Sequence, residues 1–187
     1  MPMIRAMRLL NAVEAGTTTG AQLQTLLAAD PGRLAEWNVL LGMRGQTRRM
    51  AASSTAMNAV IASSTARLAV YNSDVALSAI SASATAKAAI RAASGYTIKS
   101  VSNNTSPTTI GFTGNVIMVG FSSSNTNGNT TIQGRRAGST VGSLTITTAQ
   151  TPTNTTASFD NVMALTSGAT TSNSWSTTTH YFGVLPV

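Results

Sequence analysis

The sequence predicts an α+β protein in which helices come first and a C-terminal antiparallel β domain follows. No glycine or proline occurs between residues 46 and 94, a run of 49 residues rich in alanine, and such composition favours helix. After residue 95, serine, threonine and asparagine make up 44 of 92 residues, which is typical of strands and turns. Seven of the nine aromatic residues also lie there. We therefore predict three parts, at residues 1–45, 46–94 and 95–187.

Residues 1–45 predict three short amphipathic helices that form an anchor. Apolar residues recur at spacing three from Ile4 to Val13, on one face of the first helix. Thr18 or Thr19 is expected to cap the second helix. Asp30, followed by proline, is a typical start for the third. Three helices of this size bury too small a core to be stable alone, so we expect them to pack on another surface.

Residues 46–94 contain a ten-residue repeat. Residues 51–60 (AASSTAMNAV) and 61–70 (IASSTARLAV) are nearly identical, and 71–80 and 81–90 keep serine third, alanine ninth and valine or isoleucine tenth. Ten residues are a heptad plus three, a spacing that overwinds a coiled coil. We therefore predict one helical, coiled-coil-like shaft of roughly 70 Å, whose thin alanine-rich seam favours a parallel homotrimer. The alternatives are an alanine-rich helix packed on its own domain and a non-helical repeat.

Residues 95–187 predict a β-sandwich of jelly-roll kind, because short alternating segments follow one another at regular spacing. The expected strands are Tyr96–Val101, Asn115–Phe121, Thr130–Gln133, Thr140–Thr148, Ser158–Leu165 and Trp175–Val184. The expected inner face comprises Ile98, Val116, Met118, Phe121, Leu144, Ile146, Phe159, Val162 and Phe182.

Composition argues against an enzyme. The chain has no cysteine, one histidine and five carboxylates. In the β region only His180 and Asp160 could serve a hydrolytic triad, and no nucleophile elbow accompanies them. No Asp, Glu or His pair has metal-ligand spacing, so we predict no metal and no cofactor. No apolar run is long enough for a membrane span, and Asn11 and Glu14 interrupt any signal peptide, so we predict no membrane partner.

Basic residues concentrate in the first half of the chain, which holds nine of the twelve, and the net charge is +7. Arg44, Arg48 and Arg49 form a cluster where the anchor meets the predicted shaft. Together with Trp37 they are our candidate docking residues, because arginines at a helix junction complement carbonyl ends or an acidic partner surface. Trp37 lies on an apolar face and offers no platform for base stacking, so we predict no nucleic-acid partner.

The end of the β domain offers a candidate receptor contact. The rings of Trp175, His180 and Tyr181 could stack on a sugar of a host-surface glycan. The hydroxyl and amide groups of the surrounding residues could form hydrogen bonds with that sugar. The competing prediction places these rings in the sandwich core or in the trimer interface.

The repeat AxSSTAxxAV, with a small helical region before it and a Thr/Asn-rich β domain after it, resembles tailed-bacteriophage virion proteins. The resemblance is to small trimeric fibre or decoration proteins of the capsid, neck or tail, and its motif-level match covers residues 44–94. It implies an anchor seated on other virion proteins, an oligomeric shaft and a C-terminal domain on the outer surface of the virion, with no catalytic residues. The alternative is a bacterial surface protein, an adhesin that binds glycans or host surfaces.

Overall fold

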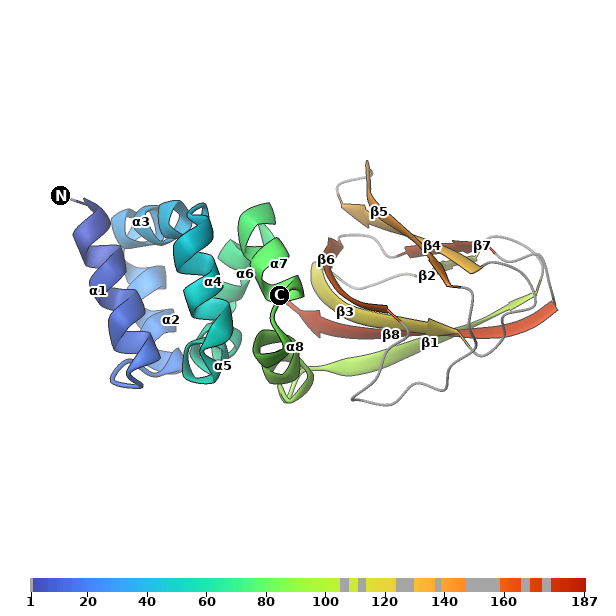
Figure 1. The fold of residues 1–187 in the computed structure, drawn as a ribbon, viewed down its shortest axis with the longest axis horizontal. Coiled ribbons are helices and arrows are strands. Elements are labelled where there is room, and N and C mark those ends of the chain that lie inside the picture. The colour runs from blue at the N-terminus through green and yellow to red at the C-terminus, as the bar shows by residue number, and fades with distance from the viewer. Residues whose placement is uncertain are drawn as a thin grey trace. The chain divides into compact units, whose positions relative to one another are not determined.

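A computed structural model describes residues 2–104, 108–110, 114–123, 130–136, 139–146, 159–165, 169–172 and 176–187. The chain divides into two compact units, Met1–Ser94 with Val187 and Gly95–Pro186. The first contains the helices and the second the sheets (Figure 1). We call them the helical unit and the β unit and describe each by itself.

Eight helices lie in the described part of the helical unit. They are α1 (Pro2–Glu14), α2 (Gly20–Ala29), α3 (Pro31–Leu41), α4 (Arg44–Ala52), α5 (Ser54–Ala62), α6 (Ser64–Tyr71), α7 (Asp74–Ser81) and α8 (Ala84–Arg91). The predicted starts of α2 and α3 are confirmed. Thr19 forms a capping box with Gln22, its amide donating to Gln22 Oε1 at 2.8 Å. Asp30 accepts from the amides of Gly32 and Arg33 at 2.9 and 3.2 Å.

The prediction of one continuous helix over residues 46–94 is wrong. The repeat forms separate helices of eight or nine residues. A serine with an extended backbone precedes each helix and separates it from the one before. Ser53, Ser63, Ser73 and Ser83 have extended backbones, and each hydroxyl accepts from the amide three residues later at 3.1 Å. A helix cap of this kind satisfies a free amide and fixes where the helix begins. Each ten-residue repeat is therefore one short helix with its cap.

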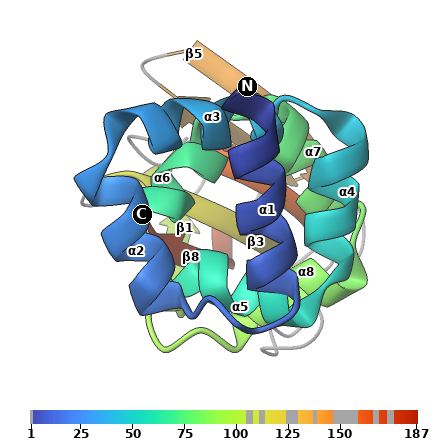
Figure 2. The ribbon, with the colours of Figure 1, turned by 90° about the vertical axis from the view of Figure 1, so that its left-hand side faces the viewer.

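The short helices stack as a superhelix with three helices in each turn. Each helix from α2 to α5 contacts the one three places later: α2 meets α5, α3 meets α6, α4 meets α7 and α5 meets α8. Figure 2 shows α2 to α5 following one another around the unit, with α6 to α8 behind them. Cap serines link successive turns, because Ser73 Oγ donates to Leu41 O at 2.9 Å and Ser83 Oγ donates to Ala51 O at 2.6 Å.

The apolar seam of the repeat is buried within this one chain. Met50, Met57, Val60, Val70 and Ile80 are all at most 1% exposed, in a core shared with α1 to α3. Residues 1–45 and 46–94 therefore pack as one unit, as in the alternative of an alanine-rich segment packed on its own domain. The seam gives no reason to expect a trimer, because other copies are not needed to bury it. The oligomeric state itself stays a prediction.

The β unit contains two four-stranded antiparallel sheets. The strands are β1 (Thr97–Asn104), β2 (Thr108–Ile110), β3 (Val116–Ser123), β4 (Thr130–Arg136), β5 (Ser139–Ile146), β6 (Phe159–Leu165), β7 (Ala169–Ser172) and β8 (Ser176–Pro186). One sheet has the order β1-β8-β3-β6 and the other β2-β7-β4-β5. All six expected strands occur, within a few residues at each end, and the short strands β2 and β7 were not anticipated.

The predicted inner face is confirmed only in part. Val116, Met118, Val162 and Phe182 are buried, whereas Ile98 is 37% exposed on β1, at the edge of its sheet. The side chains of Phe121, Leu144, Ile146 and Phe159 lie outside the described residues. In the central strand β3, successive residues from Val116 to Val119 are all buried, so both faces of this strand are covered and the expected alternation fails there.

Candidate functional site

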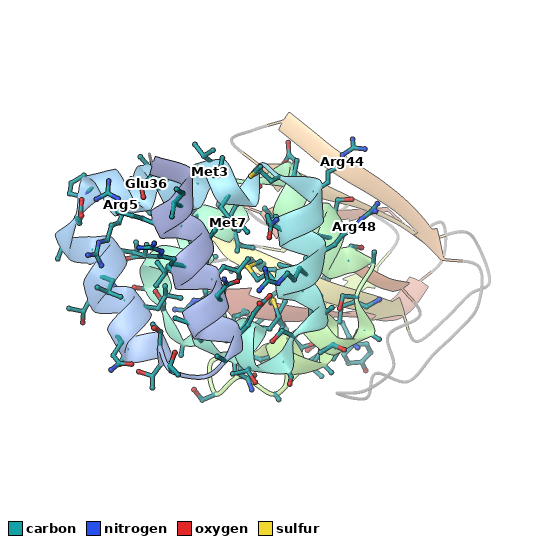
Figure 3. All side chains as sticks on the ribbon, turned by 60° about the vertical axis from the view of Figure 1, so that its left-hand side comes forward. Met3, Arg5, Met7, Glu36, Arg44 and Arg48 are labelled. Carbon is teal, nitrogen blue, oxygen red and sulfur yellow. The ribbon has the colours of Figure 1, made fainter. Side chains whose placement is uncertain are left out.

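Arg44 and Arg48 lie where the sequence places the docking cluster, on one side of α4. They are four residues apart and both are exposed. Figure 3 shows both side chains pointing outward from α4. Neither forms an ion pair with a carboxylate in the part of the chain that the structure describes. Their charges are therefore available to a partner.

The two arginines border a hollow of about 370 Å³ between α4 and α7, which we call the α4–α7 hollow. Its lining includes Arg44, Thr47, Arg48, Asp74, Ser78 and Ala82. Apart from the charged groups the walls are short side chains, so the hollow has room for a side chain from outside.

The repeat register explains why a hollow occurs at this place. Thr47 occupies the position that holds Met57, Arg67, Leu77 and Lys87 in the later repeats. It is fully buried, and its hydroxyl donates back to the carbonyls of Met43 and Arg44, each at 3.1 Å. A threonine fills less of the space between stacked helices than those longer side chains do.

Helix α4 also departs from the repeat at its start. Its N-cap residue is Met43, which makes no side-chain cap hydrogen bond, whereas the four later repeats have serine there. Its first residue is Arg44, where the later repeats have Ser54, Ser64, Asp74 and Ala84. A positive charge at a helix N-terminus opposes the helix dipole and stabilises nothing within the helix. The charged side chain of Arg44 thus forms no ion pair among the described residues and does not stabilise its own helix.

The other two predicted docking residues have internal roles. Arg49 Nη2 forms an ion pair with Glu14 and also donates to Asn11 Oδ1 at 2.5 Å, which joins α4 to α1. Trp37 is 0% exposed in the core of the helical unit, so its ring is not accessible to a partner. The sequence correctly predicts Trp37 on the apolar face of its helix, but that face points into the core. The prediction that Trp37 contacts a partner is therefore wrong for the folded unit.

A second basic hollow, of about 260 Å³, lies between α1 and α3 and was not predicted. This α1–α3 hollow is lined by Arg5, Ala6, Arg8, Leu9, Arg33 and Glu36. Arg5 forms an ion pair with Glu36, which is only 8% exposed, and Arg33 pairs with Asp30 at 3.4 Å. Figure 3 shows Arg5 and Glu36 side by side, on α1 and α3. No described carboxylate pairs with Arg8.

Sequence reasoning missed this hollow because its residues are spread along the chain. Arg5 and Glu36 are 31 residues apart, and neither belongs to a local motif. One feature of the sequence could have indicated this contact. Arg5 and Glu36 each lie beside the apolar residues of a helix, and the two helices are expected to pack together.

The candidate receptor contact is described only in part. Tyr181 is half-buried in β8, and the backbone of His180 is in register with Val101 and Ser123. Trp175 lies outside the described residues. The structure therefore does not test whether these three rings form one platform.

No protein-family model matches the chain, and no curated protein matches it. In the described ranges no group of three or more His, Cys, Asp or Glu residues could hold a metal ion. Among those same residues no helix has both the length and the apolar character of a membrane span.

Proposed function

We propose that the chain is a non-enzymatic structural protein of a tailed-bacteriophage particle. The helical unit attaches it to other virion proteins of the capsid, neck or tail, and the β unit faces outward as part of a fibre or decoration. The observation that carries the proposal is the pair of outward-pointing arginines, Arg44 and Arg48, beside a hollow at which α4 departs from the pattern of the later repeats. Neither arginine forms an ion pair within the part of the chain that the structure describes, although the carboxylate of Asp74 also lines the hollow.

The distribution of charge along the chain supports these different roles of the helical unit and the β unit. Residues 1–95 carry nine basic and four acidic side chains, whereas residues 96–187 carry Lys99, Arg135, Arg136 and Asp160 only. A basic surface favours association with an acidic partner through complementary potentials. A surface of hydroxyl and amide groups with few charges suits exposure to solvent.

A β-sandwich of jelly-roll kind is the finer fold that we propose for the β unit. Its support is the pair of four-stranded antiparallel sheets, with β4 and β5 of one sheet in contact with β6 of the other. A homotrimer also remains part of the proposal. Because the helical seam is buried within each chain, the contacts of such a trimer must come from other surfaces, and light scattering of the purified protein would count the copies.

The test is the presence and occupancy of the chain on purified particles. We expect the wild-type protein to co-purify with particles through a density gradient and to be detected by an antibody. The double variant Arg44→Ala/Arg48→Ala should fill fewer sites, whereas Lys99→Ala in the β unit, which removes an exposed charge, should fill them normally. A chain that is absent from particles would refute the virion role. Equal occupancy of both variants would refute docking through these arginines.

A further inference from the structure

Most of the large apolar side chains that are exposed in the described part of the helical unit lie within residues 3–43. Five large apolar residues are exposed in the described part of this unit, and Met3, Ile4, Val39 and Met43 are four of them. We call these four the terminal strip. Val39 is 56% exposed, the largest value in the set. The end of a helical repeat stack normally carries a polar outer face that keeps it soluble, so four exposed large apolar side chains within residues 3–43 require an explanation.

The ion pair between α1 and α3 joins the two helices that carry three of the four residues of the strip. Arg5 of α1 bonds to Glu36 of α3, and Val39 lies three residues after Glu36, on the same side of α3. Helices α1 and α3 pack on each other, so Val39 lies on the helix that contacts α1, whose first turn carries Met3 and Ile4. Met43 follows as the second of the two residues between α3 and α4. Figure 3 shows Met3 and Met7 on the side of α1 toward α4, opposite Arg5.

Positive charges flank the strip on both sides. Arg8 lies four residues after Ile4 on the same side of α1 and lines the α1–α3 hollow with Arg33. At the other end, Arg44 directly follows Met43 and borders the α4–α7 hollow. An apolar centre between two basic rims has the layout of a protein interface, with an apolar core and a charged margin.

We propose that the terminal strip and its flanking arginines bind an acidic amphipathic segment of another protein. Apolar residues of that segment cover Val39 and Ile4, and its carboxylates pair with Arg8 and Arg33 in the α1–α3 hollow and with Arg44. The inference rests on the proposed docking role of the helical unit and names the chemistry of the partner.

Two other occupants fit the surface less well. A second copy of this chain would bring arginines against arginines in a symmetric contact, and its β region contains a single carboxylate, Asp160, to pair with them. Nucleic acid would pair with the arginines, but the aliphatic centre offers no aromatic ring for base stacking. Charge complementarity therefore selects an acidic protein segment.

The experiment measures binding of a labelled synthetic peptide to the full-length chain by fluorescence anisotropy. The peptide is helical, with leucine at every third or fourth position and glutamate on both sides of the leucine stripe. A matched peptide carries lysine in place of glutamate. Vesicles of equal parts phosphatidylglycerol and phosphatidylcholine are the second probe, because exposed apolar and basic residues also suit an anionic membrane surface.

We expect the glutamate peptide to bind and the lysine peptide not to bind. Arg8→Gln/Arg33→Gln should weaken binding about tenfold, the loss expected for two exposed ion pairs, and added salt should weaken binding to the wild type. Ile4→Ser/Val39→Ser should weaken it by a similar factor. The control Leu68→Ser removes a comparably exposed leucine from α6, outside the strip, and should bind as the wild type does.

Failure has distinct forms. No binding, or equal binding by the variants with circular dichroism unchanged, would overturn the inference. Vesicle binding that the same substitutions abolish would overturn it in favour of a membrane surface, whatever the peptide does. The particle assay is independent of these measurements. A chain that is present on particles but does not bind the peptide leaves the virion role intact, and a chain that binds the peptide but is absent from particles refutes only that role.

Discussion

Replacing the cap serine Ser73 with alanine should destabilise the helical unit more than an ordinary cap substitution does. The hydroxyl of Ser73 accepts from Ala76 N at 3.1 Å and donates to Leu41 O at 2.9 Å, so it serves its own helix and the previous superhelical turn. Loss of a serine cap costs about 1 kcal/mol. Loss of the hydrogen bond to the carbonyl costs about 1 kcal/mol more. Ser73→Ala should therefore lower the free energy of unfolding by about 2 kcal/mol.

Ser53→Ala is the matched control. Ser53 caps α5 through Ala56 N at the same 3.1 Å, but no bond to an earlier turn is recorded for its hydroxyl among the described residues. Its substitution should cost about 1 kcal/mol. The difference between the two variants then isolates the bond between turns.

Urea unfolding followed by far-ultraviolet circular dichroism is the suitable assay, because the helices dominate that signal. In thermal unfolding of the same variants followed by the same signal, a loss of about 2 kcal/mol corresponds to a fall in Tm of roughly 8–16 °C for a unit of this size that unfolds cooperatively. Equal losses in Ser73→Ala and Ser53→Ala would show that the hydroxyl-to-carbonyl bond contributes nothing. No loss in either would refute the assignment of these serines as helix caps.

Three further substitutions test the packing inside each of the two units. Gly20→Ala would place a Cβ 2.4 Å from Ala62 Cβ, so we expect α2 and α5 to separate and the helical unit to lose about 1–3 kcal/mol in the same urea assay. Gly183→Ala would place a Cβ 1.7 Å from Tyr96 Oη, so the tyrosine should leave its place in the β unit, and its near-ultraviolet circular dichroism should fall while the helical signal stays. Trp37→Ala should cost about 3–5 kcal/mol as a core deletion; a stability within 1 kcal/mol of wild type would contradict the buried position of the ring.

The misreading of the repeat shows what periodicity alone could not decide. A ten-residue period is compatible with an overwound coiled coil and with a series of capped short helices. The signal that separates them is the serine at the third place of each unit, such as Ser63, because serine favours a helix cap over a helix interior. Without glycine or proline to mark the breaks, the four breaks after α4 rest on these serines.

Elsewhere the sequence was informative where the pattern was local. Asp30, and Thr18 or Thr19, were predicted as caps because the partners of a cap lie within three residues; the structure shows that Thr19 is the one that caps α2. The six longer strands were predicted from their alternation, whereas β2 and β7 span only three and four residues and are too short for a period to be recognised. The α1–α3 hollow depends on a contact between Arg5 and Glu36 that only the tertiary fold creates.

Because each ten-residue repeat adds one helix to the stack, the number of repeats determines the direction in which the last helix faces around the stack axis. Since each helix from α2 to α5 contacts the third one along, adding or deleting one repeat rotates the helices that follow by about a third of a turn. Adding or deleting three repeats restores the original direction and changes only the height of the stack. Variants of this chain that differ by thirty residues in the repeat would therefore keep the same side facing a given neighbour. Variants that differ by ten or twenty residues would turn a different side of the helical unit toward that neighbour. The number of repeats therefore sets the orientation of the last helices as well as the height of the stack.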